Sequence, residues 1–220
     1  MVIDETATPE AMRHAMVASQ LRTNAVDDPR VVLAMASVPR ETFVPSGVAA
    51  LAYRDTAVPL GGGRMLNVPM ATGRLLARAA LRTGDRVLLI GAAGGYAAAV
   101  LSRIVAEVTA VESDPALAAH ARQAMANLRN VRIVEAAFTQ GEPAGAPYDL
   151  LMIDGAVEHL PDALVAQVAI GGRAVSGLDD HGVTRLASGL RTGGGFSLEP
   201  FADSDCVTLP GFARPRGFRF

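Results

Sequence analysis

Lysine is absent from this sequence, and all 20 basic residues are arginine. A chain without an ε-amine cannot form a lysine Schiff base, hold pyridoxal phosphate covalently or supply the lysine of a phosphate-binding P-loop. The single cysteine, Cys206, can form no disulfide within the chain and cannot build a cysteine-rich zinc site. We therefore expect a reducing compartment, the cytoplasm.

Long apolar runs, charge blocks and internal repeats are also missing. No run approaches the ~18 apolar residues of a membrane span, and the histidines show no metal-ligand spacing, so we expect no membrane segment and no metal. The 220 residues carry 22 acidic and 20 basic groups, with 50% hydrophobic and 19% charged residues. This balance predicts one folded domain, or one domain with a modest appendage, and no chain-wide binding of nucleic acid.

Residues 1–68 are predicted to form a helical and loop extension that packs on the core. A hydroxyl cap at Thr8 and the proline that follows begin a helix that runs to about Arg22. A second helix is predicted over 28–38, and the proline after it ends it. The rest, up to Gly63, is rich in proline and glycine and is predicted to be loop.

Residues 69–220 predict a compact α/β core. Helices are expected at about 70–81, 95–104, 115–128 and 162–168, and strands at 86–90, 107–112, 131–134, 150–153 and 173–176. Such alternation predicts a doubly wound, mostly parallel sheet with helices on both faces. Segments 183–191 and 196–201 predict a C-terminal antiparallel hairpin. The aromatic tail, 210–220, is expected to be a strand with one buried face, in preference to a nucleic-acid-binding arm.

The turn after the first core strand has the composition of a ligand-binding turn. Gly91, Ala93 and Gly95 lie in it, and their small side chains let the backbone approach a nucleotide-like ligand. Glu112 ends the next strand, where a carboxylate can accept both hydroxyls of a ribose. The glycine spacing of a dinucleotide-binding turn is not present, so we expect an adenosyl group such as that of S-adenosylmethionine instead of a pyrophosphate.

The chain resembles the protein-L-isoaspartate O-methyltransferases, which are class I S-adenosylmethionine enzymes. The resemblance covers nearly the whole sequence, and its most specific part is the run V-P-R-E-T-F-V-P at 38–45. Further matches are Q-L-R at 20–22, D-P-R-V at 28–31, A-Y-R-D at 52–55 and G-Y-A-A-A-V-L at 95–101. The resemblance implies a Rossmann-like methyltransferase fold, S-adenosylmethionine as cofactor and an isoaspartyl protein or peptide as substrate.

Several positions depart from the family pattern. Leu89 stands where the family ends its first strand with an acid, and Ala93 replaces the middle glycine of the turn. Ala137 aligns with the aspartate that faces the adenine, although Phe138 can stack on adenine in its place. Asn67 stands where the family places the serine beside the reacting carboxylate.

Methyl transfer to a carboxylate needs no general base, because a carboxylate acceptor is already ionised at neutral pH. The protein has to position the acceptor in line with the methyl group. An amide can donate a hydrogen bond to that carboxylate, which makes Asn67 the first catalytic candidate, although Asn67 can also serve only to stabilise its loop. Asp154 is the second candidate and is expected either to contact the ligand or, more readily, to cap a following helix. If Asp154, Glu158 or His159 acts as a base, the acceptor is an amine or hydroxyl instead.

Three functions remain open at this point. The first is methylation of an isoaspartyl carboxylate. The second is a degenerate relative that keeps the fold without turnover and serves as a binding or scaffold module, and the third is a methyltransferase with a different acceptor. Binding of S-adenosylmethionine separates the second function from the other two.

Overall fold

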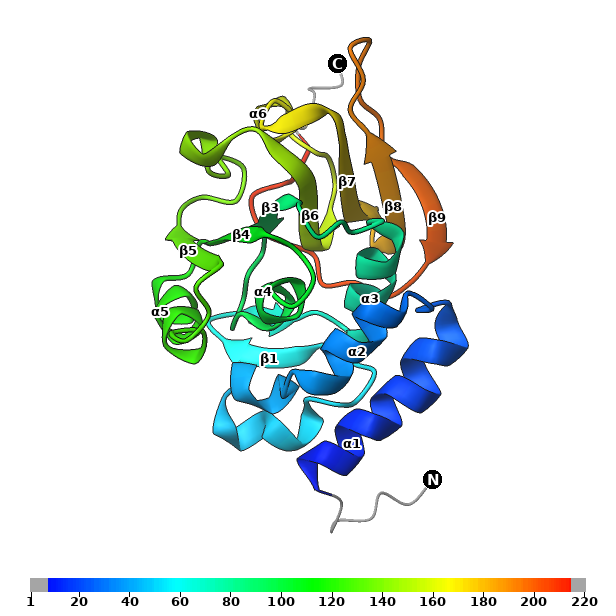
Figure 1. The fold of residues 1–220 in the computed structure, drawn as a ribbon, viewed down its shortest axis with the longest axis vertical. Helices are drawn as coiled ribbons and strands as arrows, with labels where there is room; N and C mark the ends of the chain where they lie inside the picture. Colours follow the sequence, from blue (N-terminus) through cyan, green and yellow to red (C-terminus); the bar gives the residue numbers. More distant parts are fainter. Residues whose placement is uncertain (1–7, 215–220) are drawn as a thin grey trace, which may run out of the picture.

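The computed structural model describes residues 8–214 of the chain. This part of the chain forms a seven-stranded sheet in the order β5-β4-β3-β6-β7-β8-β9, with β5 at one edge and β9 at the other (Figure 1). The first five strands of that order are parallel, and the last two pair antiparallel. The prediction of a mostly parallel sheet is confirmed.

The strands at the centre of the sheet agree best with the prediction. The seven are β3 (Arg86–Ile90), β4 (Glu107–Glu112), β5 (Val131–Glu135), β6 (Tyr148–Val157), β7 (Val168–Asp180), β8 (Val183–Leu190) and β9 (Glu199–Asp203). β3 is a near-continuous apolar run, as expected of a central strand with both faces buried. β6 runs four residues past its predicted end at Ile153, since Ala156 exchanges hydrogen bonds with Val207 and Leu209 in the tail.

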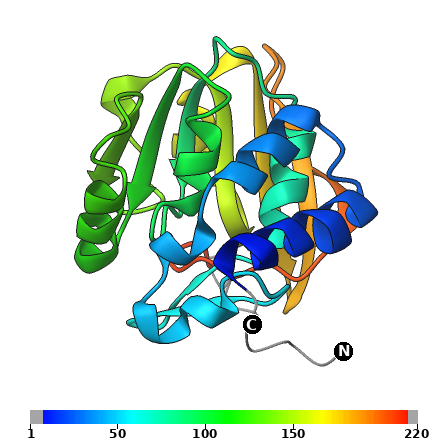
Figure 2. The ribbon, with the colours of Figure 1, turned by 60° about the horizontal axis from the view of Figure 1, so that its bottom comes forward.

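Helices cover both faces of the sheet. α3 (Pro69–Arg78), α4 (Tyr96–Leu101) and α5 (Pro115–Ala124) pack on the face that Val87 and Leu89 present. Figure 2 shows α3 and α4 stacked there beneath α2 (Pro29–Ser37), which contacts both. The opposite face, to which Leu88 and Ile90 point, is covered by the short α6 (Asp162–Val165) and by the tail residues Leu209 and Phe212.

The N-terminal extension joins the same hydrophobic core. α1 (Pro9–Met16) begins at the Thr8 cap and continues in helical turns to Asn24, so the first predicted helix is confirmed. The predicted loop before Gly63 is wrong in part, because it contains two 3₁₀ turns and a small hairpin of β1 (Val58–Gly61) and β2 (Arg64–Leu66). These strands are too short to give a two-residue periodicity in the sequence.

The C-terminal strands form a meander, and the predicted antiparallel hairpin of β8 and β9 is confirmed. After β9 the chain turns back, and residues 206–212 cross the carboxyl ends of β3 and β6, where Thr208 forms an isolated parallel bridge with Ala156. Most of the predicted tail strand, 215–220, lies outside the described residues. None of the helices in the described range 8–214 is long and apolar enough to cross a membrane.

Candidate cofactor and acceptor site

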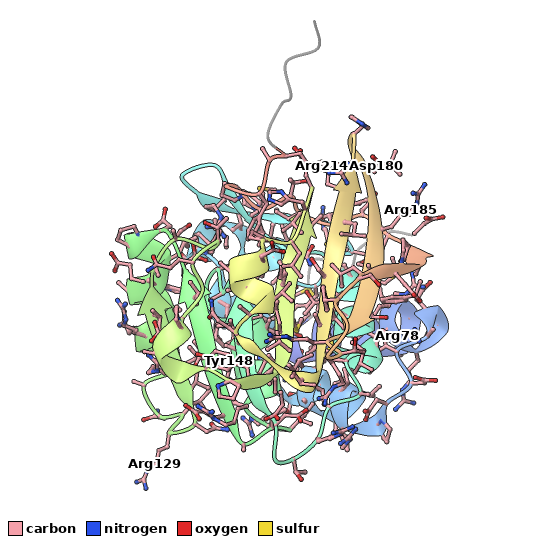
Figure 3. The ribbon with its side chains drawn as sticks, turned by 90° about the horizontal axis from the view of Figure 1, so that it is seen from above. Arg78, Arg129, Tyr148, Asp180, Arg185 and Arg214 are labelled. Atoms are coloured by element: carbon pink, nitrogen blue, oxygen red, sulfur yellow. The ribbon has the colours of Figure 1, made fainter. Side chains whose placement is uncertain are left out.

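The carboxyl edge of the parallel strands collects most of the predicted site residues. The register pairs Ile90 with Val111 and with Ile153, so the residues after β3, the end of β4 and the outer part of β6 share one edge. Figure 3 shows Asp180 and Arg214 at this end of the molecule and Tyr148, at the start of β6, toward the other end. Ligands of open α/β sheets bind at such an edge.

Glu112 holds the turn that follows β3. Its carboxylate is fully buried and accepts hydrogen bonds from the backbone N–H of Ala93 at 2.7 Å, of Ser113 at 2.9 Å and of Asp114 at 3.0 Å. It also forms an ion pair with Arg64, whose Nη1 lies 2.5 Å from Oε1 and whose Nη2 lies 3.3 Å from Oε2. A buried carboxylate needs such partners, because its desolvation is otherwise uncompensated.

Phe138 lies in the loop after β5 and contacts the same arginine. The Arg64 guanidinium carbon is 4.9 Å from the centroid of the Phe138 ring, which is a cation–π arrangement. The ring of Phe212, from the tail, stacks beside it at 6.5 Å between centroids and 10° between planes. Arg64 thus contacts both Glu112 and Phe138. These are the two residues that the sequence predicts to contact the ribose and the adenine of the cofactor.

The tail also lies against the turn. A methyl group on the Gly91 Cα would be 2.8 Å from Leu209 Cδ1, so the leucine occupies the space that the glycine leaves open. Gly95 is not part of this arrangement, since a methyl group there would lie 2.6 Å from Met125 Cε, beyond the end of α5. Its role in this structure is close packing of the turn against the helix.

An adenosyl group does not fit this conformation. Gly91, Ala93, Glu112 and Phe138 are all buried within the described range 8–214, so they present almost no surface to a ligand. The residue types suit the ligand, since a carboxylate and an aromatic ring flank a turn of small residues, but Arg64 and Leu209 fill the space. The chain itself satisfies the groups that a nucleoside would contact.

Asn67 joins three segments at the same sheet edge. It lies between β2 and α3, and its Nδ2 donates to Asp154 Oδ1 at 2.9 Å, while the backbone N–H of Val207 donates to its Oδ1 at 3.1 Å. Thr72 Oγ1 donates to the same Asp154 oxygen at 2.7 Å. These contacts fix the orientation of the amide, because its oxygen and nitrogen face different partners.

The predicted helix cap at Asp154 is wrong. The residue lies inside β6, which continues to Val157, so no helix begins directly after it, and the next helix, α6, has Pro161 at its N-cap. Burial raises the pKa of Asp154 above its usual 3.8, and the hydrogen bonds from Asn67 and Thr72, together with the charge of Arg40, act in the opposite direction. Asp154 is therefore placed to orient Asn67.

Arg40, from the V-P-R-E run, contacts the backbone of Asn67 and so belongs to the same cluster as Asn67 and Asp154. It is fully buried, its Nε donates to Ala52 O at 2.7 Å and its Nη2 donates to Asn67 O. Its guanidinium carbon lies 4.6 Å from the centroid of the Tyr96 ring. Burial raises the pKa of the Tyr96 hydroxyl to about 12, so this ring stays neutral beside the cation.

Glu158 and His159 anchor the tail. Glu158 Oε2 accepts a hydrogen bond from the backbone N–H of Arg214 at 2.8 Å, and His159 Nδ1 lies 2.9 Å from Phe212 O. These contacts hold the C-terminal segment over the sheet edge. Burial also raises the pKa of the Cys206 thiol to about 12, so the thiol that precedes this segment stays protonated.

Comparison with known proteins decides the family. The family model Protein-L-isoaspartate(D-aspartate) O-methyltransferase matches residues 12–196. The chain belongs to this family. The Protein-L-isoaspartate O-methyltransferase 1 of Rhodopseudomonas palustris (strain HaA2) is 41% identical over 194 residues, which cover 87% of this chain and 79% of that protein. The Protein-L-isoaspartate O-methyltransferase 2 of Pelobacter propionicus is 41% identical over 168 residues, covering 76% and 75%.

Solved structures of the protein-L-isoaspartate O-methyltransferases share the fold. One matches with a TM-score of 0.77 and 22% identity over 93% of this chain and 66% of that chain. Another, from Plasmodium falciparum and solved in complex with S-adenosyl-L-homocysteine, has a TM-score of 0.77 and 18% identity over 90% and 97%. The predicted family and fold are confirmed.

Sequence reasoning missed two residues that lie at the candidate site, Arg64 and Leu209. Arg64 follows three glycines and reads as an exposed loop residue, and its partner Glu112 is 48 positions away. Leu209 lies in a tail whose sequence gives no sign of which surface it covers. The one available signal was the buried acid itself, because a carboxylate predicted at the end of an apolar strand requires a cation or a ligand.

Proposed function

We propose that this chain is an S-adenosylmethionine-dependent O-methyltransferase that methylates the carboxylate of an isoaspartyl residue in a damaged protein or peptide. Membership of the family and 41% identity to enzymes with that name support the proposal. The observation that carries it within the structure is the Asn67–Asp154 pair, which lies at the same sheet edge as Glu112 and the Gly91 turn. The free thiol of Cys206 is consistent with the proposed cytoplasmic location.

The chain's part in this reaction is to bind and orient the acceptor. A carboxylate with an unperturbed pKa of about 4 is ionised at neutral pH, so the nucleophile needs no general base. An amide nitrogen has two N–H donors, and Asp154 accepts only one of those of Asn67. Only 2% of Asn67 is exposed, so we assign the second donor to the acceptor carboxylate in a conformation in which the tail has moved from Asn67. This assignment makes Asn67 the residue that contacts substrate and Asp154 a positioning residue.

Methyl ester formation tests the proposal. The protein is incubated with methyl-labelled S-adenosylmethionine and an isoaspartyl peptide, and the volatile methanol released in mild base is counted. Label is expected with the isoaspartyl peptide and not with the same peptide carrying ordinary aspartate. Asn67→Ala is expected to lower the rate at least about tenfold, the effect of one hydrogen bond to a charged group, whereas Asn67→Ser retains a donor and most of the rate.

Two outcomes would contradict the proposal in different ways. If the labelled methyl group is found on another acceptor and is not released as methanol in mild base, the chain is a methyltransferase of different specificity. If no variant transfers the methyl group or binds the cofactor, the chain has the binding or scaffold function without turnover.

A further inference from the structure

We propose that Arg64 determines cofactor affinity in this protein by competing with the adenosyl group for Glu112 and Phe138. This inference rests on the proposed function, since it concerns the same site. It assigns a role to a residue that lies outside the predicted catalytic and cofactor-binding sets. The cofactor binds only when the Arg64 guanidinium leaves the position it holds in the described structure.

Glu112 has no acceptor capacity to spare while Arg64 is bound. The carboxylate accepts five hydrogen bonds, three from the backbone N–H groups of Ala93, Ser113 and Asp114 and two from Arg64. A carboxylate offers about four lone-pair sites. A ribose hydroxyl can therefore be accepted only in exchange for a hydrogen bond from Arg64.

Phe138 is held in the same way. Its ring contacts the Arg64 guanidinium, with 4.9 Å between guanidinium carbon and centroid, and the ring of Phe212. Only 3% of Phe138 is exposed, so a purine could not reach its face without displacing a neighbour. One side chain thus blocks the two contacts that recognise a nucleoside, which makes the competition direct.

Arg64 lies on a small hairpin outside the main sheet. It begins β2, a three-residue strand that pairs only with β1 in a two-stranded sheet separate from the main one. The preceding residues Gly61, Gly62 and Gly63 are exposed and have positive φ angles of 93°, 57° and 76°. Glycine adopts these angles without steric cost, so the turn before Arg64 is unstrained and carries no side chains that hold it against the core.

The test is isothermal titration calorimetry with S-adenosylhomocysteine on the full chain. Arg64→Gln removes the charge and keeps a polar side chain of similar length, and Arg64→Ala removes the side chain. Both variants are expected to bind at least about tenfold more tightly than the wild type, because one charge-assisted contact no longer competes. Arg74→Ala is the control, since Arg74 is a separate arginine on α3 whose Nη1 donates to Asp203 O at 3.2 Å; its affinity should equal that of the wild type.

Thermal unfolding gives a second readout that does not depend on activity. Without ligand the Arg64 variants should melt below the wild type, because Glu112 loses its counter-charge, and S-adenosylhomocysteine should raise their melting temperatures more than that of the wild type. If Arg64→Ala does not fold, the Arg64→Gln and Leu209→Ala variants provide the comparison, and Leu209→Ala should also bind more tightly.

The outcomes separate this inference from the proposed function. Equal affinity of the wild type and the Arg64 variants overturns the inference and leaves the methyltransferase proposal standing. Absence of binding by the wild type and by every variant at millimolar ligand overturns both.

Discussion

Replacing Glu112 by glutamine removes the negative charge from the most buried ion pair of the site. The Glu112 side chain is 0% exposed and that of Arg64 is 9% exposed. Breaking a buried pair by removing one partner costs about 3–5 kcal/mol. Glutamine keeps one acceptor oxygen for the turn, and Arg64 retains some access to water, so we expect the lower end, about 3 kcal/mol of unfolding free energy.

The matched control is Glu107→Gln. Glu107 pairs with Arg86 at 3.2 Å, but the two side chains are 44% and 41% exposed. Exposed pairs contribute about 0–1 kcal/mol, so this variant should be nearly as stable as the wild type.

Urea unfolding of both variants, of Arg64→Gln and of the Arg64→Gln/Glu112→Gln double variant completes the experiment. The double variant should lose less unfolding free energy than the sum of its single changes, because neither charge is left unpaired. Equal losses for Glu112→Gln and Glu107→Gln, or strict additivity in the double variant, would refute the assignment of a coupled buried pair.

Three further predictions concern the turn, the acceptor cluster and the tail. Gly94→Ala should destabilise the protein by about 3 kcal/mol or more in urea unfolding, because its methyl group would lie 2.0 Å from Phe43 O, whereas Gly84→Ala, with nothing within 4 Å, should not. Burial raises the pKa of Asp154 above 3.8, so the native state binds its proton more tightly than the unfolded chain. The unfolding free energy should therefore fall as pH rises from about 4 toward the raised pKa, and Asp154→Asn should flatten this part of the pH profile. Cys206 is partly exposed, and burial raises the pKa of its thiol to about 12. The thiol should therefore react with a thiol reagent at pH 8 more slowly in the folded protein than after unfolding, and equal rates would contradict the raised pKa.

The sheet could be predicted from the sequence because its signals are local. β3 and β4 begin and end at the predicted residues, since each has a buried segment of mostly β-branched and aliphatic residues that follows a polar first residue. The start of α5 follows from its cap, because the Asp114 side chain accepts from the backbone N–H of Ala116 at 2.8 Å and of Leu117 at 3.0 Å.

The site could be predicted only where its residues end a strand or follow a recognised motif. Glu112, Asn67 and Asp154 meet this condition, and the structure places them at one sheet edge. The helix-cap prediction for Asp154 is wrong because the continuation of β6 depends on Val207, a residue 53 positions away that no local pattern connects to it. The position of Arg64 likewise follows from tertiary contacts.

The most direct test of the central claim is a crystal structure of Arg64→Ala with S-adenosylhomocysteine. We predict that both ribose hydroxyls lie within hydrogen-bonding distance of Glu112, at about 2.5–3.0 Å, that the adenine contacts Phe138 and that Leu209 has moved from Gly91. Two results would contradict the account. One is a ligand bound elsewhere on the protein. The other is a Glu112 that is still hydrogen-bonded only to the turn, with the tail still occupying the ligand position.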